Sequence, residues 1–106
     1  MRYYSERQLQ KNKLLKEGDY TSIREMLERI RKYVPKNLIL SELDSNTNII
    51  DHTAEEIYEE VMNLGEGFHR AGFRGKHIAI ISENCYRYII ADICISSGVG
   101  VVTPID

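Results

Sequence analysis

The chain of 106 residues has no tryptophan, only two prolines and two cysteines, and no long apolar run. A membrane-spanning helix needs about 20 consecutive apolar residues, and the N-terminal region also lacks the apolar stretch of a secretory signal. The sequence therefore predicts a cytoplasmic protein without a membrane span. The 42% of hydrophobic and 28% of charged residues are typical of a soluble globular domain and exclude collagen-like and disordered classes.

The scarcity of cysteine limits redox and metal chemistry. Cys85 and Cys94 lie nine positions apart on one predicted helix, which places them on opposite sides of its axis and about 13 Å apart along it. They cannot form a disulfide within that helix or share one metal ion. We expect both to be small packing residues in a reducing compartment.

The net charge of −2 is distributed unevenly. Residues 1–36 contain ten Lys/Arg and five Asp/Glu, whereas residues 37–106 contain four and eleven. A basic arm can indicate nucleic-acid binding. Here the basic residues alternate with Glu and Leu at helical spacing, without the aromatic residues on which bases stack. We therefore expect a solvated helical surface and no nucleic-acid partner.

The N-terminal half predicts an arm, a helix and a hairpin. Residues 1–18 have weak periodicity and predict a weakly ordered or helical arm. Ser22, with Glu25 three positions later, forms a capping box that starts a helix ending before Pro35. Short apolar runs at 38–40 and 49–50 flank a turn-forming Asp-Ser-Asn segment, which predicts a small antiparallel hairpin.

A second capping box predicts the longest helix. Thr53 caps it and Glu56 completes the box, and an apolar stripe follows at helical spacing. Gly72 is expected to end the helix with a positive φ, with Phe73 folding back as the apolar partner of that cap. Two glycines within the helix, Gly65 and Gly67, suggest the close approach of a neighbouring element.

The last third predicts a parallel strand–helix–strand unit. The continuous apolar run 78–81 is typical of a strand buried on both faces. A loop over 82–84 leads to a largely buried helix over 85–97, which Gly98 ends, and a strand over 99–103 precedes Pro104. The predicted fold class is α/β: a partial layered domain with this short parallel unit, a small hairpin and two to three covering helices.

The loop before the last helix is the natural place for a phosphate site, because helix N-termini bind anions. It reads Ser82-Glu83-Asn84 and lacks the glycine that lets backbone approach a phosphate closely. Glu83 would also repel the ligand. We therefore expect Ser82 or Asn84 to cap the helix instead.

Other ionisable residues do not form a recognisable site. His52, His69 and His77 lack metal-ligand spacing and are expected on the surface, and Asp92 is expected to be exposed or paired with Arg87. A run of four glutamates is expected to be a solvated face and no carboxylate dyad: Glu55, Glu56, Glu59 and Glu60. The sequence therefore assigns no catalytic, cofactor-binding or metal-binding residue.

Residues 20–106 resemble the opening of the AMP-forming adenylating enzymes, the acyl-CoA synthetase family, and in particular long-chain fatty-acid CoA ligases. The resemblance covers a first helix in YTSIREMLERIRKYVPKNLIL, a glycine-ended helix in AEEIYEEVMNLGEGFHRAGFRGK, and the closing segment HIAIISENCYRYIIADICISSGVGVVTPID. The matching positions are Gly72, Gly75, the apolar strand 78–81, Ser82, Asn84, Ala91, Gly98, Gly100, Pro104, Ile105 and Asp106. Asp51-His52, Lys76 and Tyr88 depart from the family's usual Thr-Tyr, acidic residue and tryptophan, which leaves the substrate open.

The resemblance implies that residues 19–106 are the N-terminal, incomplete part of a large adenylating domain. Such an enzyme joins a carboxylate to ATP and passes the acyl group to coenzyme A, with magnesium assisting. The family's phosphate loop, adenine-binding motif and catalytic lysine would follow residue 106, so the 106-residue chain is expected to be inactive by itself. Its expected partner is the rest of the enzyme, with self-association through uncovered sheet edges as a further expectation.

Two other functions stay open at this point. The chain could be a stand-alone, non-catalytic interaction module derived from the same family. It could also be a small nucleotide-binding protein of the doubly wound class, although its glycine-free loop argues against that function.

Overall fold

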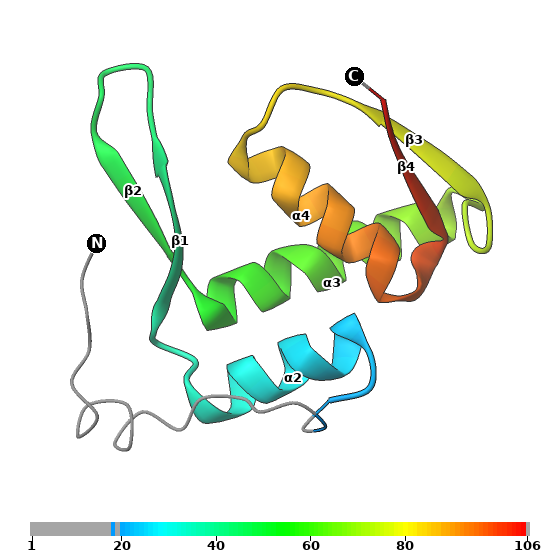
Figure 1. Ribbon diagram of the computed structural model, residues 1–106, viewed down its shortest axis with the longest axis horizontal. Helices are drawn as coiled ribbons and strands as arrows, with labels where there is room; N and C mark the ends of the chain where they lie inside the picture. The colour runs from blue at the N-terminus through cyan, green and yellow to red at the C-terminus, as the bar shows by residue number, and fades with distance from the viewer. Residues whose placement is uncertain (1–17, 19, 106) are drawn as a thin grey trace.

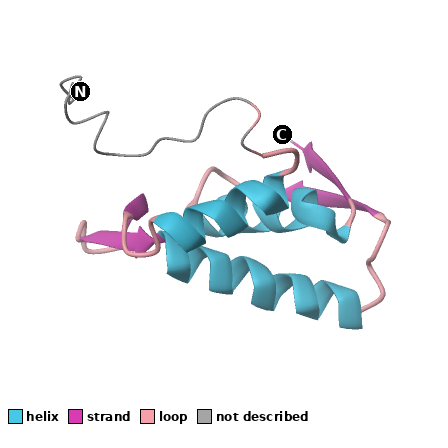
Figure 2. Ribbon diagram, turned by 90° about the horizontal axis from the view of Figure 1, so that it is seen from below, coloured by secondary structure: helices cyan, strands magenta, loops and turns pink. Residues whose placement is uncertain are grey.

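The computed structural model describes residue 18 and residues 20–105, so the predicted arm over residues 1–18 lies outside the described residues apart from Gly18. Figure 1 shows helix α3 between helices α2 and α4, with a β-hairpin at one end of the helices and a parallel strand pair at the other, and Figure 2 agrees. The predicted α/β class is confirmed. Among the described residues, no helix combines the length and the apolar character needed to cross a bilayer. The elements are α2 (Ile23–Tyr33), β1 (Leu38–Leu43), β2 (Ile49–Thr53), α3 (Ala54–Arg70), β3 (His77–Ile81), α4 (Tyr86–Cys94), the π-helical turn η1 (Ile95–Val99) and β4 (Val101–Ile105).

Helix α2 begins where the capping chemistry predicts. The Ser22 hydroxyl accepts a hydrogen bond from the Glu25 N–H at 3.1 Å. The Glu25 carboxylate accepts hydrogen bonds from the N–H and hydroxyl of Thr21, so the predicted box closes one residue earlier than expected. Leu27 is the buried residue of this helix and anchors it to the core.

The predicted hairpin is confirmed and is longer than the two apolar runs indicated. Strands β1 and β2 pair antiparallel, with Leu40 opposite His52 and Ser41 opposite Asp51. The Asp44 carboxylate accepts hydrogen bonds from the N–H groups of Asn46 and Asn48, at 2.8 and 2.9 Å, and so closes the turn. Strand alternation points the side chains of Leu40, Glu42 and His52 toward the helices.

Helix α3 follows strand β2 without a loop, because Thr53 both ends the strand and caps the helix. Its hydroxyl accepts the Glu56 N–H at 3.2 Å. At the other end Gly72 has φ 82°, and the Phe73 N–H donates to the Phe68 carbonyl at 3.0 Å. The two phenylalanine rings meet edge to face at 5.9 Å. The predicted glycine cap with its apolar contact is therefore confirmed.

The core lies where α3 crosses α2 and α4, and Gly65 makes close packing possible there. A Cβ at Gly65 would lie 3.5 Å from the Cys94 sulfur, whereas a Cβ at Gly67 would meet nothing within 4 Å. The expected close approach thus occurs at Gly65 alone. Cys94 is buried and its thiol donates to the Val61 carbonyl at 3.3 Å. The core cluster consists of Leu27, Ile57, Val61, Ile90 and Cys94.

The last helix differs from the prediction at both ends. Cys85 is an exposed N-cap without a side-chain hydrogen bond to the helix, so it is not a packing residue and neither Ser82 nor Asn84 caps the helix. The α-helix ends at Cys94 and continues as the π-helical turn η1, in which Gly98 has φ 132°. A bend of this kind requires glycine, because a side chain strains the backbone at such an angle.

Strands β3 and β4 pair in parallel, with His77 opposite Val101 and Ile81 opposite Ile105. The predicted strand over 99–103 is shifted, because β4 begins at Val101 and continues through Pro104. The prediction of a strand buried on both faces is wrong for the described chain. Residues 77, 79 and 81 of β3 are exposed and only residues 78 and 80 are half-buried.

Candidate functional site

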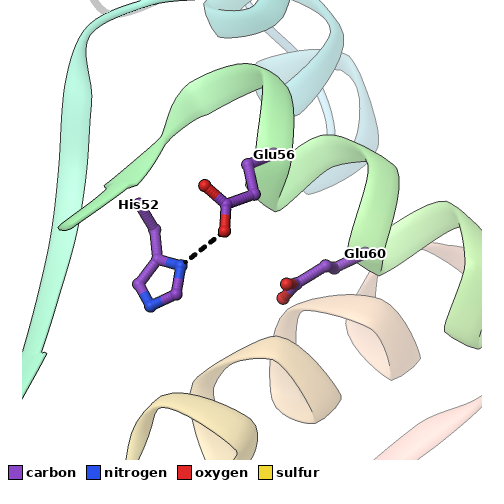
Figure 3. A group of neighbouring side chains, drawn as sticks. All are labelled: His52, Glu56 and Glu60. Carbon is purple, nitrogen blue, oxygen red and sulfur yellow. Dashed lines mark hydrogen bonds and ion pairs between the residues drawn. The ribbon is translucent and has the colours of Figure 1, made fainter. Parts of the chain in front are cut away.

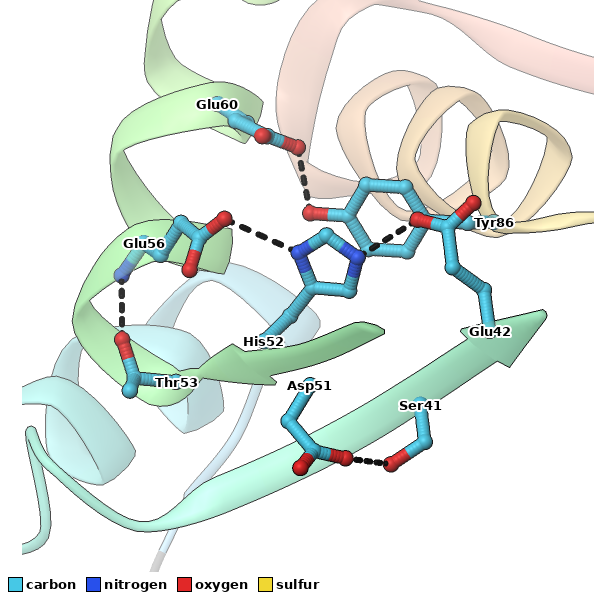
Figure 4. A network of polar contacts seen from close by, with 8 residues as sticks. All are labelled: Ser41, Glu42, Asp51, His52, Thr53, Glu56, Glu60 and Tyr86. Carbon is cyan, nitrogen blue, oxygen red and sulfur yellow. Dashed lines mark hydrogen bonds and ion pairs between the residues drawn. The ribbon is translucent and has the colours of Figure 1, made fainter. Parts of the chain in front are cut away.

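The most densely connected polar group in the described chain surrounds His52, for which the sequence predicts a surface position. His52 is only 6% exposed, and each of its ring nitrogens faces a carboxylate. Nδ1 lies 2.9 Å from Glu56 Oε1, and Nε2 lies 2.5 Å from Glu42 Oε2. Figure 4 shows the imidazole held between these two side chains. The expectation of a surface histidine is therefore wrong for His52.

The two carboxylates favour the protonated ring. Burial by itself lowers the pKa of His52, because a charge loses hydration in the interior. Hydrogen bonds to Glu56 and Glu42 act in the opposite direction and prevail, so the pKa of His52 lies above the usual 6.5. As an imidazolium, His52 donates to both carboxylates, whereas a neutral ring would turn one lone pair toward a carboxylate oxygen.

Tyr86 covers one face of the imidazole ring. Its ring stacks on His52 with centroids 3.7 Å apart and planes 7° from parallel. Its hydroxyl donates a hydrogen bond to the Glu60 carboxylate. Burial and the neighbouring Glu60 carboxylate both disfavour the phenolate, so the pKa of Tyr86 is raised. We call the five residues the His52 cluster: Glu42, His52, Glu56, Glu60 and Tyr86.

Four elements contribute to the His52 cluster, namely β1, β2, α3 and α4 (Figure 4). Because Thr53 starts α3 directly after β2, His52, Glu56 and Glu60 follow one another at four-residue intervals along the same side. That spacing was visible in the sequence and was the one signal that could have revealed the cluster. Glu42 and Tyr86 come from distant parts of the chain, and no local pattern connects them to His52.

The other predicted positions do not join this cluster. His69 and His77 are exposed, on the last turn of α3 and on β3 respectively. Asp92 is half-buried, and no ion pair between Asp92 and Arg87 occurs in the described part of the chain. The prediction of a solvated glutamate face holds for Glu55 and Glu59 and is wrong for Glu56 and Glu60, which are half-buried members of the His52 cluster.

Three members of the cluster have metal-ligand chemistry. Donor atoms of His52, Glu56 and Glu60 lie within 4.8 Å of one another (Figure 3). Each already has a protein partner, since His52 is bound by Glu42 and Glu56, and Glu60 by Tyr86. An ion would have to displace these contacts. The cluster is therefore explained as a buried imidazole hydrogen-bonded to two carboxylates, which joins the hairpin to α3 and α4.

The β3–α4 loop does not fit a phosphate group. Ser82, Glu83 and Asn84 are exposed, and the Ser82 hydroxyl donates to the Glu83 carbonyl. The neighbouring hollow between β1 and α4 is lined by Glu42 and by no lysine or arginine. A nucleotide phosphate would meet carboxylates there instead of cations, so the described residues supply no ATP site at this loop.

Comparison with solved structures finds several chains of similar fold. A long-chain-fatty-acid CoA ligase from Rhodopseudomonas palustris superposes with a TM-score of 0.70 and 18% sequence identity, over 81% of this chain and 21% of that chain. The chain shares its fold with a segment of that ligase. It spans about a fifth of the length of that ligase. No family model matches the sequence, and no curated protein matches it.

The fold shared with that ligase agrees with the fold that the sequence resemblance implies. At 18% identity it supports the shared fold and leaves the activity open. The described segment provides helices, a hairpin and a strand pair, while the His52 cluster occupies the junction between the hairpin and the helices.

Proposed function

We propose that this chain is a scaffold segment of an ATP-dependent acid–CoA ligase. The fold shared with a long-chain-fatty-acid CoA ligase over 81% of the chain is the observation that carries the proposal. The reaction would proceed in two steps. A carboxylate oxygen attacks the α-phosphorus of ATP and releases pyrophosphate, and the thiol sulfur of coenzyme A then attacks the acyl carbon and releases AMP. Magnesium would neutralise the phosphate oxygens in the first step.

In this proposal the described residues form part of the enzyme's scaffold and take part in no chemical step. The β3–α4 loop does not fit a phosphate, and the His52 cluster is occupied by its own hydrogen bonds. ATP, magnesium and coenzyme A would therefore bind to the remainder of a longer, cytoplasmic enzyme. The chain spans only about a fifth of the structural relative, which agrees with a segment that acts together with further polypeptide.

The test begins with the reading frame after the codon for Asp106. We expect it to continue through a Ser/Thr/Gly-rich stretch that ends in lysine. The purified longer protein should form AMP and an acyl-CoA from a panel of fatty acids, ATP, magnesium and coenzyme A. The 106-residue chain should catalyse no exchange of pyrophosphate into ATP with the same acids.

The alternative function, a stand-alone interaction module, predicts different results. A stop codon directly after Asp106, with a protein of this size in cell extracts, would support the module and contradict the ligase proposal. Pyrophosphate exchange by the 106-residue chain alone would contradict both.

A further inference from the structure

The His52 cluster holds more negative charge than its own contacts neutralise. Three carboxylates, those of Glu42, Glu56 and Glu60, surround one imidazole. Among the described residues, no lysine or arginine forms an ion pair with any of them, and the hydrogen-bond partner of Glu60 is the neutral phenol of Tyr86. Three carboxylates against one imidazolium leave an excess of two negative charges. A divalent cation is therefore attracted to this half-buried position.

His52 has the orientation of a metal-binding histidine. Such a histidine donates the N–H of one ring nitrogen to a carboxylate, which leaves the lone pair of the other nitrogen for the metal ion. Nε2 of His52 lies 2.5 Å from Glu42, so Glu42 can accept that N–H. Nδ1 then turns its lone pair toward the side of α3 that carries Glu56 and Glu60 (Figure 3). The imidazole is only 6% exposed and stacks on Tyr86, so packing fixes this orientation.

Nδ1 and the two glutamates of α3 form a set of three donors. Ligand atoms of His52, Glu56 and Glu60 lie within 4.8 Å of one another. An ion would displace the His52–Glu56 hydrogen bond and share Glu60 with Tyr86. The existing bonds use Oε1 of Glu56 and Oε2 of Glu60, and the second oxygen of each has no hydrogen bond within the described residues. Ligand atoms around tetrahedral zinc lie about 3.3–3.5 Å apart, so a small movement of two flexible side chains completes the site.

We propose that the His52 cluster binds a zinc ion, with Nδ1 of His52 and one carboxylate oxygen each from Glu56 and Glu60 as ligands. Zinc binds imidazole together with carboxylates and can hold water in a fourth position, whereas magnesium and calcium take oxygen ligands. When the ring is protonated, the ion replaces the Nδ1 proton, which passes to solvent. Because the ligands come from β2 and α3, the ion joins the hairpin to the helix. The inference does not depend on the proposed ligase function.

Calorimetric titration of the 106-residue chain with zinc chloride tests the proposal. Cys85→Ser serves as the background, because it removes an exposed thiol that could bind zinc by itself. We expect one zinc ion per chain and a melting temperature that rises with the zinc concentration, because the ion binds the folded state. Magnesium chloride and calcium chloride at the same concentrations should produce neither effect. Absence of zinc binding would overturn the proposal, and so would equal binding of magnesium.

A matched pair of variants on α3 locates the ion. Glu60→Gln removes a ligand charge and leaves both contacts of His52 intact, and its amide oxygen can still accept the Tyr86 hydroxyl. Glu59→Gln makes the same change at the exposed neighbouring position. We expect Glu60→Gln to weaken zinc binding at least about tenfold, a loss found even for residues that only orient a ligand. Glu59→Gln should bind zinc as the parent does.

The far-ultraviolet circular dichroism of both variants without zinc should match that of the parent, which separates loss of the site from loss of the fold. Equal zinc affinities of Glu60→Gln and Glu59→Gln would overturn the assignment of the ion to the His52 cluster. Zinc bound equally well by the parent, by both variants and by His52→Gln would show an adventitious ion only.

Discussion

Single residues explain how the hairpin is attached to the helices. His52 is the last residue of β2 before the helix cap, and its two ring nitrogens reach β1 and α3 at the same time. Tyr86 adds a stacked ring from the start of α4. Hydrogen bonds with a charged partner contribute about 1.5–3 kcal/mol each, so the protonation state of one imidazole affects the junction of three segments.

The first prediction concerns pH. A histidine whose pKa is raised by folding contributes its full stabilisation when the pH is below the pKa of the unfolded state, near 6.5. This contribution is lost as the pH rises through the pKa of the folded state. At pH 6, His52→Gln should lower the free energy of unfolding by about 1.5–3 kcal/mol. As the pH rises through the folded pKa of His52, the difference from the wild type should become smaller. Urea unfolding of the wild type and of His52→Gln, at half-unit steps between pH 5.5 and 9, measures this difference in the free energy of unfolding.

His77→Gln is the matched control, because His77 is exposed on β3 and belongs to no described hydrogen-bond network. It should leave the stability profile close to that of the wild type. The explanation based on a protonated His52 would be wrong if the difference between the wild type and His52→Gln grew with increasing pH.

At the scale of elements, local capping chemistry could be predicted and long-range geometry could not. Ser22, Thr53 and Gly72 define helix ends through contacts within a few residues, so the sequence was sufficient to place them. The extent of β4 depends on whether the Pro104 nitrogen faces β3 or the outside, which only the pairing register decides. The His52 cluster was missed for a similar reason, because Glu42 and Tyr86 reach His52 only after the chain has folded.

The second prediction concerns the turn between η1 and β4. Gly100 lies so close to β3 that a Cβ there would overlap the backbone oxygen of Lys76. Backbone cannot yield as a flexible side chain does, so Gly100→Ala should destabilise the fold by at least about 2 kcal/mol. Chemical denaturation of the 106-residue chain measures this loss.

Gly67→Ala is the matched control within helix α3, because a Cβ at Gly67 meets no atom within 4 Å. Alanine is favoured over glycine inside a helix by about 1 kcal/mol, so this variant should be as stable as the wild type or more stable. Equal losses for the two variants would show that Gly100 is not constrained by its approach to Lys76.

At the scale of the whole molecule, the two cysteines differ in exposure, and their reactivity indicates whether the core is closed. Cys85 is exposed at the start of α4, whereas Cys94 is buried in the core at 2% exposure. Burial raises the pKa of the Cys94 thiol, which reduces its reactive thiolate form. Opening of the core should therefore be required before Cys94 reacts.

The third prediction follows for thiol labelling. With a chromogenic disulfide reagent, the native chain should show one fast thiol, and a second should appear only slowly or in denaturant. Cys85→Ser should abolish the fast phase and leave the slow one unchanged. Two thiols reacting together in the native protein would contradict the packing of Cys94 between α3 and α4.

The parallel pairing of β3 with β4 also has a consequence for synthesis on the ribosome. His77 can pair with Val101 only after Val101 has been synthesised, 24 residues later. At roughly 5–20 residues per second the delay is roughly 1–5 s, while α4 forms and docks on α3. During that interval β3 emerges with both of its edges unpaired and its isoleucines exposed. The nascent chain is therefore most vulnerable to misassociation, and most suited to chaperone binding, after β3 has left the exit tunnel and before β4 has followed it.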